Sequence, residues 1–129
     1  MATASKTRRK KTKRSLPKGT VHVQATFNNT IVSITDDGGN VVTWKSSGSA
    51  GFKGSRKSTP YAAQIAAEKA IEQAKDLGLT KVDVIIKGIG SGRESAVRAL
   101  MASGVSINSI KVITGIPHNG CRPRKARRI

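Results

Sequence analysis

Positive charge is concentrated at the two ends of this chain, and that distribution limits what each part can fold into. Residues 1–18 carry eight Lys/Arg and no acid, and residues 111–129 carry six Lys/Arg and no acid. The other ten basic residues share residues 19–110 with all seven acids, which leaves a charge of only +3 there. Segments with uncompensated like charge do not form a packed core unless they meet a polyanion. The sequence therefore predicts a nearly balanced domain between two cationic ends.

Proline and glycine residues, which interrupt helices and strands, mark the boundaries of this domain. Pro17-Lys18-Gly19 marks its entry, so residues 1–18 are predicted to be a disordered basic N-terminal arm. After Thr114 the chain holds two prolines and two glycines, which exclude a helix or a paired central strand. We therefore expect a single α/β domain at residues 19–115 and a disordered basic C-terminal tail at residues 116–129.

Alternation of apolar and polar residues predicts three short strands at the start of the domain, at residues 21–27, 30–35 and 40–45. Asn28-Asn29 and the Asp-Asp-Gly-Gly run at 36–39 separate them. The asparagine pair tolerates the positive φ of a hairpin turn. Three strands on two tight turns form an antiparallel meander.

Two helices are predicted from their start signals. Thr59 is the expected N-cap of a helix that begins at Pro60, where the missing N–H costs nothing, and runs to about Leu77. Ser91 and Glu94 fit the S-x-x-E capping box of a second helix. The inward faces are predicted to consist of Ala63, Ala67, Ala70, Ala74 and Leu77 in the first helix and Ala96, Val97, Leu100 and Met101 in the second.

Two more strands complete the predicted sheet. Residues 81–87 are nearly all apolar, which favours a central strand, and residues 107–113 form the last strand. The order is then βββαβαβ, and its two strand–helix–strand crossovers favour right-handed connections and parallel pairing. We predict an α/β fold with a five-stranded mixed sheet and a ribonuclease-H-like outline.

The charge distribution is typical of a protein that binds nucleic acid. A surface selected only for solubility would mix both signs of charge along the chain. The four aromatic residues, Phe27, Trp44, Phe52 and Tyr61, are too few and too scattered for base stacking on a sheet. The sequence therefore favours a protein that binds phosphates and RNA shape.

Four cationic segments supply the candidate RNA-binding residues. Residues 53–57 lie in a Gly/Ser-rich loop before a helix, and its glycines let backbone approach a phosphodiester closely. Residues 88–93 join a strand to a helix N-terminus, where free N–H groups attract phosphate. A solvated loop and a plain tight turn are the alternatives for these two segments. The candidates are Arg8, Arg9, Lys10, Lys11, Lys13 and Arg14 in the arm, Lys53, Arg56 and Lys57 in the loop, Gly90, Gly92 and Arg93 in the turn, and Arg122, Arg124, Lys125, Arg127 and Arg128 in the tail.

No cofactor is predicted. The turn at 88–93 departs from the dinucleotide fingerprint G-x-G-x-x-G because residue 93 is Arg, and no acid lies about 20 residues further on. No Walker sequence is present. His118 and Cys121 would supply only two of the four ligands of a zinc site, and one cysteine excludes an internal disulfide.

The sequence also argues against an enzyme. A nuclease with a ribonuclease-H-like outline needs clustered acids to hold two metal ions. Here Asp36 and Asp37 occupy a turn, Asp83 lies on a distant strand, and Glu68 and Glu72 lie on a helix face. No G-x-S-x-G elbow for a nucleophile occurs.

A cytosolic location is expected. No apolar run approaches the roughly 20 residues that a membrane-spanning helix needs. The basic N-terminus lacks the apolar region of a secretory signal. We therefore expect no membrane partner.

Three separated stretches resemble one protein family. They are GTVHVQATFNNTIVSITD at 19–36, GIGSGRESA at 88–96 and HNGCRPRKARRI at 118–129. Together they resemble the bacterial form of the eleventh small-subunit ribosomal protein family, and the resemblance extends over essentially the whole chain.

The resemblance implies a structural protein on the platform of the 30S subunit that bridges helices of 16S ribosomal RNA near the Shine–Dalgarno cleft. It implies the seventh and eighteenth small-subunit proteins as neighbours and initiation factor three nearby, without a homo-oligomer. It implies that the 53–57 loop, the turn at Arg93 and the tail from His118 and Asn119 to Arg128 face RNA. The alternatives from other classes are a free-standing nucleic-acid-binding or RNA-chaperone protein and a nuclease.

Overall fold

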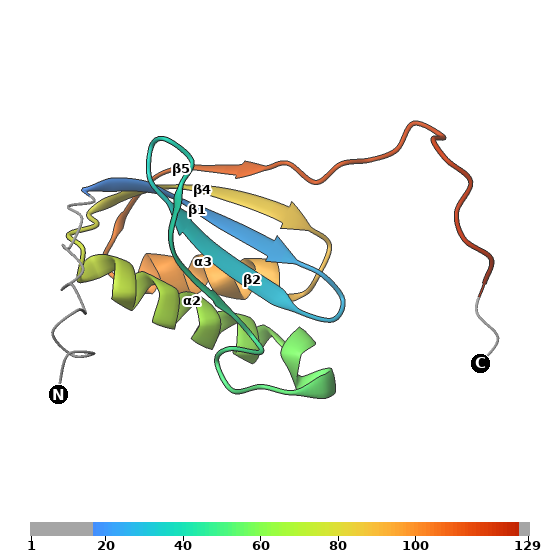
Figure 1. Ribbon diagram of the computed structural model, residues 1–129, viewed down its shortest axis with the longest axis horizontal. Helices are drawn as coiled ribbons and strands as arrows, with labels where there is room; N and C mark the ends of the chain where they lie inside the picture. Colours follow the sequence, from blue (N-terminus) through green and yellow to red (C-terminus); the bar gives the residue numbers. More distant parts are fainter. Residues whose placement is uncertain (1–16, 127–129) are drawn as a thin grey trace, which may run out of the picture.

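The computed structural model describes residues 17–126 as a five-stranded mixed sheet with two long helices packed on one of its faces (Figure 1). This confirms the predicted α/β class. The elements are β1 (Lys18–Ala25), β2 (Thr30–Thr35), β3 (Val41–Ser46), the short 3-10 helix η1 (Gly54–Ser58), α2 (Pro60–Lys75), β4 (Lys81–Gly88), α3 (Gly92–Ala102) and β5 (Ser106–Val112).

The sheet has the strand order β3-β2-β1-β4-β5. β1, β2 and β3 pair antiparallel, as a meander should, whereas β4 pairs parallel with β1 on one side and with β5 on the other. β4 is therefore an interior strand, as its apolar sequence predicted. The connection through α2 carries the chain from the β3 edge past β2 to the far side of β1, so β3 and β4 are not neighbours.

The β1–β2 connection is a hairpin, as predicted, because the antiparallel pairing continues to Ala25 and Thr30 and the N–H of Thr26 donates to the carbonyl of Asn29 at 2.8 Å. It is a loop in which the Thr26 hydroxyl accepts hydrogen bonds from the N–H groups of Asn28 (3.3 Å) and Asn29 (3.1 Å). Among residues 17–126, the only non-glycine residue with a positive φ is Asn119, at 60°. The hairpin therefore forms without positive φ at the asparagine pair, because side-chain hydrogen bonds hold the loop in ordinary backbone conformations.

Helix α2 packs closely on the sheet because its inner face consists mainly of alanine. The Thr59 hydroxyl accepts a hydrogen bond from the N–H of Ala62 at 3.2 Å, which confirms the predicted N-cap. Leu77, beyond the helix, is partly buried against the core. The buried residues of α2 are Ala62, Ala63, Ala66, Ala67, Ala70, Ile71 and Ala74, which include the predicted alanine stripe.

Helix α3 departs from two predictions. Ser91 has helical φ and ψ and makes no side-chain cap bond, so the capping box with Glu94 was wrong. Its hydroxyl instead donates to the carbonyl of Ser58 at 3.0 Å. Ala96, Val97 and Leu100 are buried as predicted, but Met101 is 57% exposed, because it lies beside the β5 edge where no other residue within 17–126 covers it. The predicted inward position of Met101 was therefore wrong.

The hydrophobic core lies between the helices and one face of the sheet. In β1, Val21, Val23 and Ala25 are buried, while the intervening residues are more accessible. The alternation follows from the two-residue period of a strand. Within residues 17–126, neither helix has the length and apolarity needed to cross a membrane.

Asp83 fixes the irregular pairing between β4 and β5. The register shifts at Val82/Asp83. Asn108 and Ser109 donate side-chain hydrogen bonds to the Asp83 carboxylate at 3.1 and 3.0 Å. The Asn108 bond, then the Ser109 bond, and more weakly the charges of Lys18 and Lys111, hold the pKa of Asp83 below its ordinary value of 3.8. This acid stabilises a strand edge.

The lowered pKa of Asp83 predicts a pH-dependent contribution to stability. Because the pKa is lower in the folded state, the stabilisation is present above about pH 3.8 and is lost as the pH falls through the folded pKa. The difference in free energy of unfolding between wild type and Asp83→Asn should therefore shrink below about pH 3.8. Urea denaturation across pH measures this difference. As a control, Asn108→Ala should raise the pKa of Asp83 in an NMR titration, and an unchanged pKa would contradict the assigned cause.

Candidate nucleic-acid interface

The predicted cationic segments of the domain meet at one end of the sheet. β1, β4 and β5 run in the same direction, so their carboxyl ends and the N-termini of α2 and α3 lie together (Figure 1). We call this part the carboxyl end; it comprises the connections at 26–29, 47–59 and 88–91 and the start of the tail. Hydrogen bonds join these connections, from Gly90 N–H to the Ala25 carbonyl at 3.1 Å and from Ser91 to Ser58 at 3.0 Å.

The C-terminal tail leaves the domain from a fixed point at the carboxyl end. The N–H of Ile113 donates to the carbonyl of Ile86 at 2.9 Å, and the Thr114 hydroxyl accepts from the N–H of Gly88 at 3.1 Å. Beyond this point, residues 115–126 are exposed and make no hydrogen bond to another described residue. The tail extends away from the domain (Figure 1).

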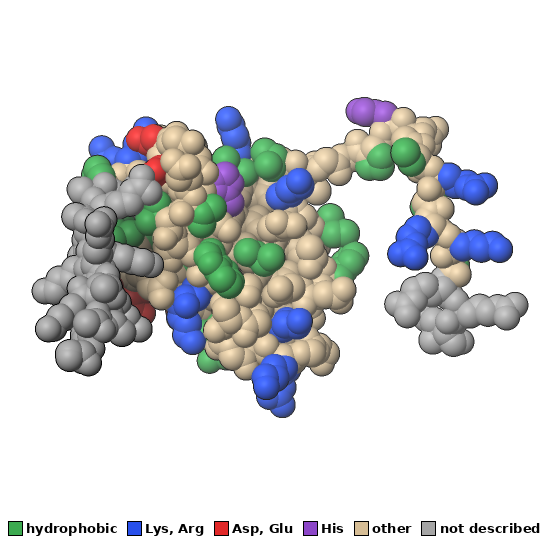
Figure 2. Space-filling model, in the orientation of Figure 1, with side chains coloured by type: hydrophobic (Ala, Val, Ile, Leu, Met, Phe, Trp, Pro, Cys, Tyr) green, Lys and Arg blue, Asp and Glu red, His purple; other side chains and the backbone are tan. Residues whose placement is uncertain are grey.

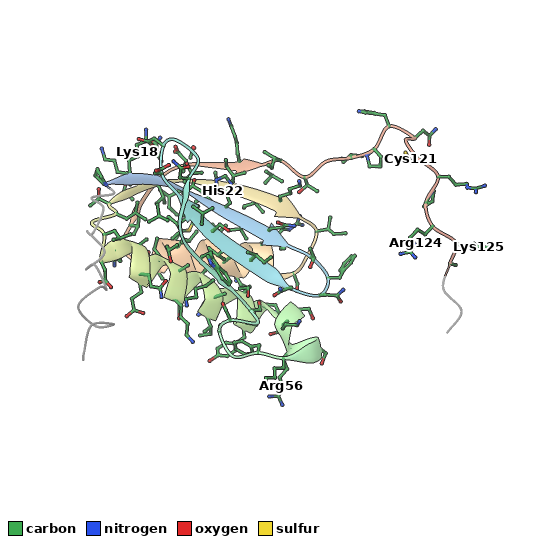
Figure 3. All side chains as sticks on the ribbon, in the orientation of Figure 1. Lys18, His22, Arg56, Cys121, Arg124 and Lys125 are labelled. Carbon is green, nitrogen blue, oxygen red and sulfur yellow. The ribbon has the colours of Figure 1, made fainter. Side chains whose placement is uncertain are left out.

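The described cations of the tail are open to a partner on several sides. Arg122, Arg124 and Lys125 are exposed, as are His118 and Asn119. Figure 2 shows the Lys and Arg side chains along the tail, and Arg124 and Lys125 project to different sides of it in Figure 3. The predicted residues Arg8, Arg9, Lys10, Lys11, Lys13, Arg14, Arg127 and Arg128 lie outside the described residues.

The 53–57 segment is more ordered than the loop predicted from its glycines. Residues 54–58 form the 3-10 helix η1, and its flanking rings, Phe52 and Tyr61, pack edge to face with centroids 5.8 Å apart. Lys53 and Arg56 are exposed, whereas Lys57 is partly buried. Arg56 projects from η1 into solvent (Figure 3). The fold therefore presents this cationic segment in a defined position.

The glycines of the 88–92 turn have a packing role that sequence reasoning missed. A Cβ on Gly90 would overlap the Thr26 carbonyl oxygen, and a Cβ on Gly92 would lie 2.6 Å from the Ala63 Cβ. Both glycines are buried, and the Gly90 N–H is already bonded to Ala25. The turn's available donors are thus the first N–H groups of α3, which have no partner within the helix.

Arg93 is the exposed cation at the start of α3. Its guanidinium donates a long, 3.5 Å hydrogen bond to the carbonyl of Gly88. A bond of this length leaves the guanidinium available to a phosphate, beside the positive end of the helix dipole. Lys87 is a further exposed cation at the end of β4 that sequence reasoning missed. Its position as the last charged residue of a predicted strand was the available signal.

The acids are distributed unevenly over the fold. Asp36 and Asp37 in the β2–β3 turn and Asp83 early in β4 lie at the end opposite to the carboxyl end. Figure 2 shows acidic side chains on that side of the domain, away from the cationic tail. Glu72 and Asp76 lie at or near the C-terminal end of α2, Glu68 lies in its middle, and Glu94 lies in the first turn of α3 at the carboxyl end. Among residues 17–126, no three His, Cys, Asp or Glu side chains are grouped closely enough to hold a metal ion.

An α/β domain with cationic connections and a cationic tail at one end is typical of proteins that bind structured RNA. Comparison with known families is specific: the model of the family described as Ribosomal protein S11 matches residues 19–128. The match covers most of the chain, and the chain therefore belongs to the ribosomal protein S11 family. The family is a structural, non-enzymatic class of small-subunit proteins that associate with rRNA and other ribosomal proteins.

Proposed function

We propose that this protein binds 16S rRNA on the platform of the 30S subunit and bridges rRNA helices near the Shine–Dalgarno cleft. One structural observation supports this proposal in addition to the family membership. Three sets of cations lie together at the carboxyl end: those of the 53–57 segment, Arg93 and those of the tail. Glu94, in the first turn of α3, is an acid among them. A surface of this sign that extends from a rigid domain onto a long tail is suited to contact more than one RNA helix.

Each predicted segment has a distinct part in this proposal. The domain at residues 19–115 is the rigid base, and the ends at residues 1–18 and 116–129 bind between RNA helices and neutralise phosphates. Arginine predominates in the tail, and its planar guanidinium suits bidentate phosphate contacts. Gly90 and Gly92, both buried, act by shaping the turn that carries Arg93, rather than by contacting RNA directly. The direct contacts in the described chain are then Lys53, Arg56, Lys57, Arg93, His118, Asn119, Arg122, Arg124 and Lys125.

The proposal includes the protein neighbours implied by the resemblance. These are the seventh and eighteenth small-subunit proteins, with initiation factor three nearby, in cytoplasmic ribosomes. A homo-oligomer is not expected, because a net charge of +17 makes copies of the chain repel each other. The ribonuclease-H-like outline is also part of the proposal, and the meander followed by two parallel strands supports it.

Chemical footprinting of 16S rRNA with and without the protein tests the proposal. Two or more separate rRNA helices should be protected at moderate salt, and the protein should co-sediment with 30S particles. Binding that protects no discrete helix, or a protein that stays off 30S particles, would favour the free-standing RNA-chaperone alternative. The same footprints compared between variants then assign the segments.

Replacing Arg93 with Ala is expected to weaken binding to 16S rRNA about tenfold without unfolding the domain. One charge-assisted hydrogen bond contributes about 1.5 kcal/mol, and the side chain is exposed. Filter binding at several salt concentrations measures the effect, and the salt slope should fall by about 1. Arg98→Ala, an exposed arginine further along α3, is the matched control and should change the affinity little. A large loss of thermal stability in Arg93→Ala would instead indicate a structural role in the turn.

A further inference from the structure

An apolar groove lies between α3 and the outer strand β5, and one end of it reaches Arg93 beside the 88–92 turn. Ile86, Val97, Met101 and Val112 line it, and Arg93, Glu94 and Arg98 stand at its rim, around a volume of about 600 Å³. Val112 is 63% exposed and Met101 57% exposed. Single exposed apolar residues are ordinary, but a contiguous group in a groove marks a binding surface.

The outer edge of β5 has no partner strand among residues 17–126. β5 pairs only with β4. The N–H of Ile113 points to β4, because it donates to Ile86. Backbone groups of alternate residues point to opposite sides of a strand. The N–H and C=O groups of Ile110 and Val112 therefore face outward and are free to pair with another chain.

This edge carries few of the features that protect open strand edges. Natural edge strands are shielded by prolines, inward charges or covering segments. β5 has no proline, one charged residue, Lys111, and a single register shift near its start, between Ile107 and Ser109. Ile110 and Val112 have their backbone groups outward and remain 44% and 63% exposed. An open, apolar edge of this kind predicts pairing with a strand.

Charge indicates which kind of chain binds to the groove and the β5 edge. The N-terminal arm carries seven Lys/Arg within residues 1–16 and no acid, so the rim, where Arg93 and Arg98 outnumber Glu94, repels it. A second copy brings a net charge of +17 to a surface that is already cationic. RNA cannot form a strand ladder with the edge. A protein segment with acidic and apolar side chains can fill the apolar groove, pair with the arginines at its rim and bond to the free backbone groups of β5.

We propose that β5 and the α3–β5 groove bind an extended segment of another small-subunit ribosomal protein. The segment adds a sixth strand beside β5 through the backbone groups of Ile110 and Val112. Its apolar side chains contact Val112 and Met101, and an acidic side chain lies opposite Arg98. This protein-docking surface does not include the tail or the 53–57 segment, it shares Arg93 with the proposed rRNA contacts, and it goes beyond those contacts.

Amide hydrogen exchange in intact 30S subunits tests the added strand. The N–H groups of Ile110 and Val112 should exchange at least about 100-fold more slowly in the subunit than in the free protein, since a buried ladder bond must open before exchange. The exposed residues 37–39, in the β2–β3 turn at the opposite end of the sheet, are the internal reference. Equal exchange of Ile110 and Val112 in the free and assembled protein overturns the proposal.

Photo-crosslinking identifies the occupant. Benzoylphenylalanine at position 101 of the full chain, assembled into 30S subunits, should crosslink to a peptide of a different ribosomal protein that contains apolar and acidic residues. Adding Val112→Lys should reduce this yield at least about fivefold, because it places a charge against an apolar, cationic groove. Val41→Lys is the matched control, a valine 57% exposed on the opposite edge strand, and should leave the yield unchanged. Crosslinks only to rRNA, only to a second copy of this chain or to no partner overturn the proposal.

Discussion

Removing residues 119–129 is expected to weaken binding to 16S rRNA by about 100-fold or more while the domain stays folded. The deletion removes Arg122, Arg124, Lys125, Arg127 and Arg128. Two charge-assisted hydrogen bonds of about 1.5 kcal/mol each already correspond to this factor. The domain should keep its thermal midpoint, because residues 115–126 make no hydrogen bond to another described residue.

The salt dependence of binding separates phosphate neutralisation from other effects of the tail. The slope of log affinity against log salt should fall by about 0.7–0.9 for each phosphate that the shortened chain no longer neutralises. A full-length variant with Arg122, Arg124 and Lys125 replaced by Gln should show most of this change. Its control replaces three exposed cations outside the carboxyl end, Lys75, Lys81 and Arg98, and should keep most of the affinity. An unchanged slope after deletion would show that the tail does not touch phosphate.

Gly88→Ala is expected to lower the free energy of unfolding by about 3 kcal/mol. The backbone of Gly88 has a φ of 112°, which a residue with a side chain rarely adopts. An added Cβ would overlap the carbonyl oxygen of Ala25 and lie 2.9 Å from its carbonyl carbon. Backbone strain costs about 1–3 kcal/mol and overpacking a similar amount. Urea denaturation measures the loss.

Gly115→Ala is the matched control for Gly88→Ala. No atom lies within 4 Å of a Cβ at Gly115, so its free energy of unfolding should change by less than about 0.5 kcal/mol. Gly90→Ala should resemble Gly88→Ala, because its Cβ would also meet backbone of the β1–β2 connection. If Gly88→Ala were as stable as the control, the turn would not pack against β1 as closely as the structure has it.

Local sequence signals predicted most of the elements because those elements depend on nearby residues. The meander and the N-cap at Thr59 follow from alternation and from a single side chain that bonds three residues ahead. The failures share a different cause. Ser91 could bond either to its own helix or to Ser58, which is 33 residues away, and no local pattern distinguishes the two. Met101 matches a helical apolar stripe, but its exposure depends on β5 being the edge.

The sequence also predicted the cationic segments, but not how they are arranged. Lys53, Arg93 and Arg122 lie far apart along the chain, and a solvated loop or turn is a local alternative for each of them. The parallel direction of β1, β4 and β5 brings them to one end. The separation of Asp36, Asp37 and Asp83 from that end likewise follows from strand direction. Strand direction depends on pairing over long distances in sequence, which residue type does not specify.

By itself, the sequence determined that this protein has a nearly balanced α/β domain with strongly cationic ends, because composition and periodicity are properties of the chain. The three separated stretches also sufficed for the family resemblance, which the match over residues 19–128 confirms. Only the tertiary structure decided that β5 is an open edge beside an apolar groove, and that the 88–92 glycines are required for packing. These features depend on which strands become neighbours and how closely backbones approach, and both are settled when the whole domain packs.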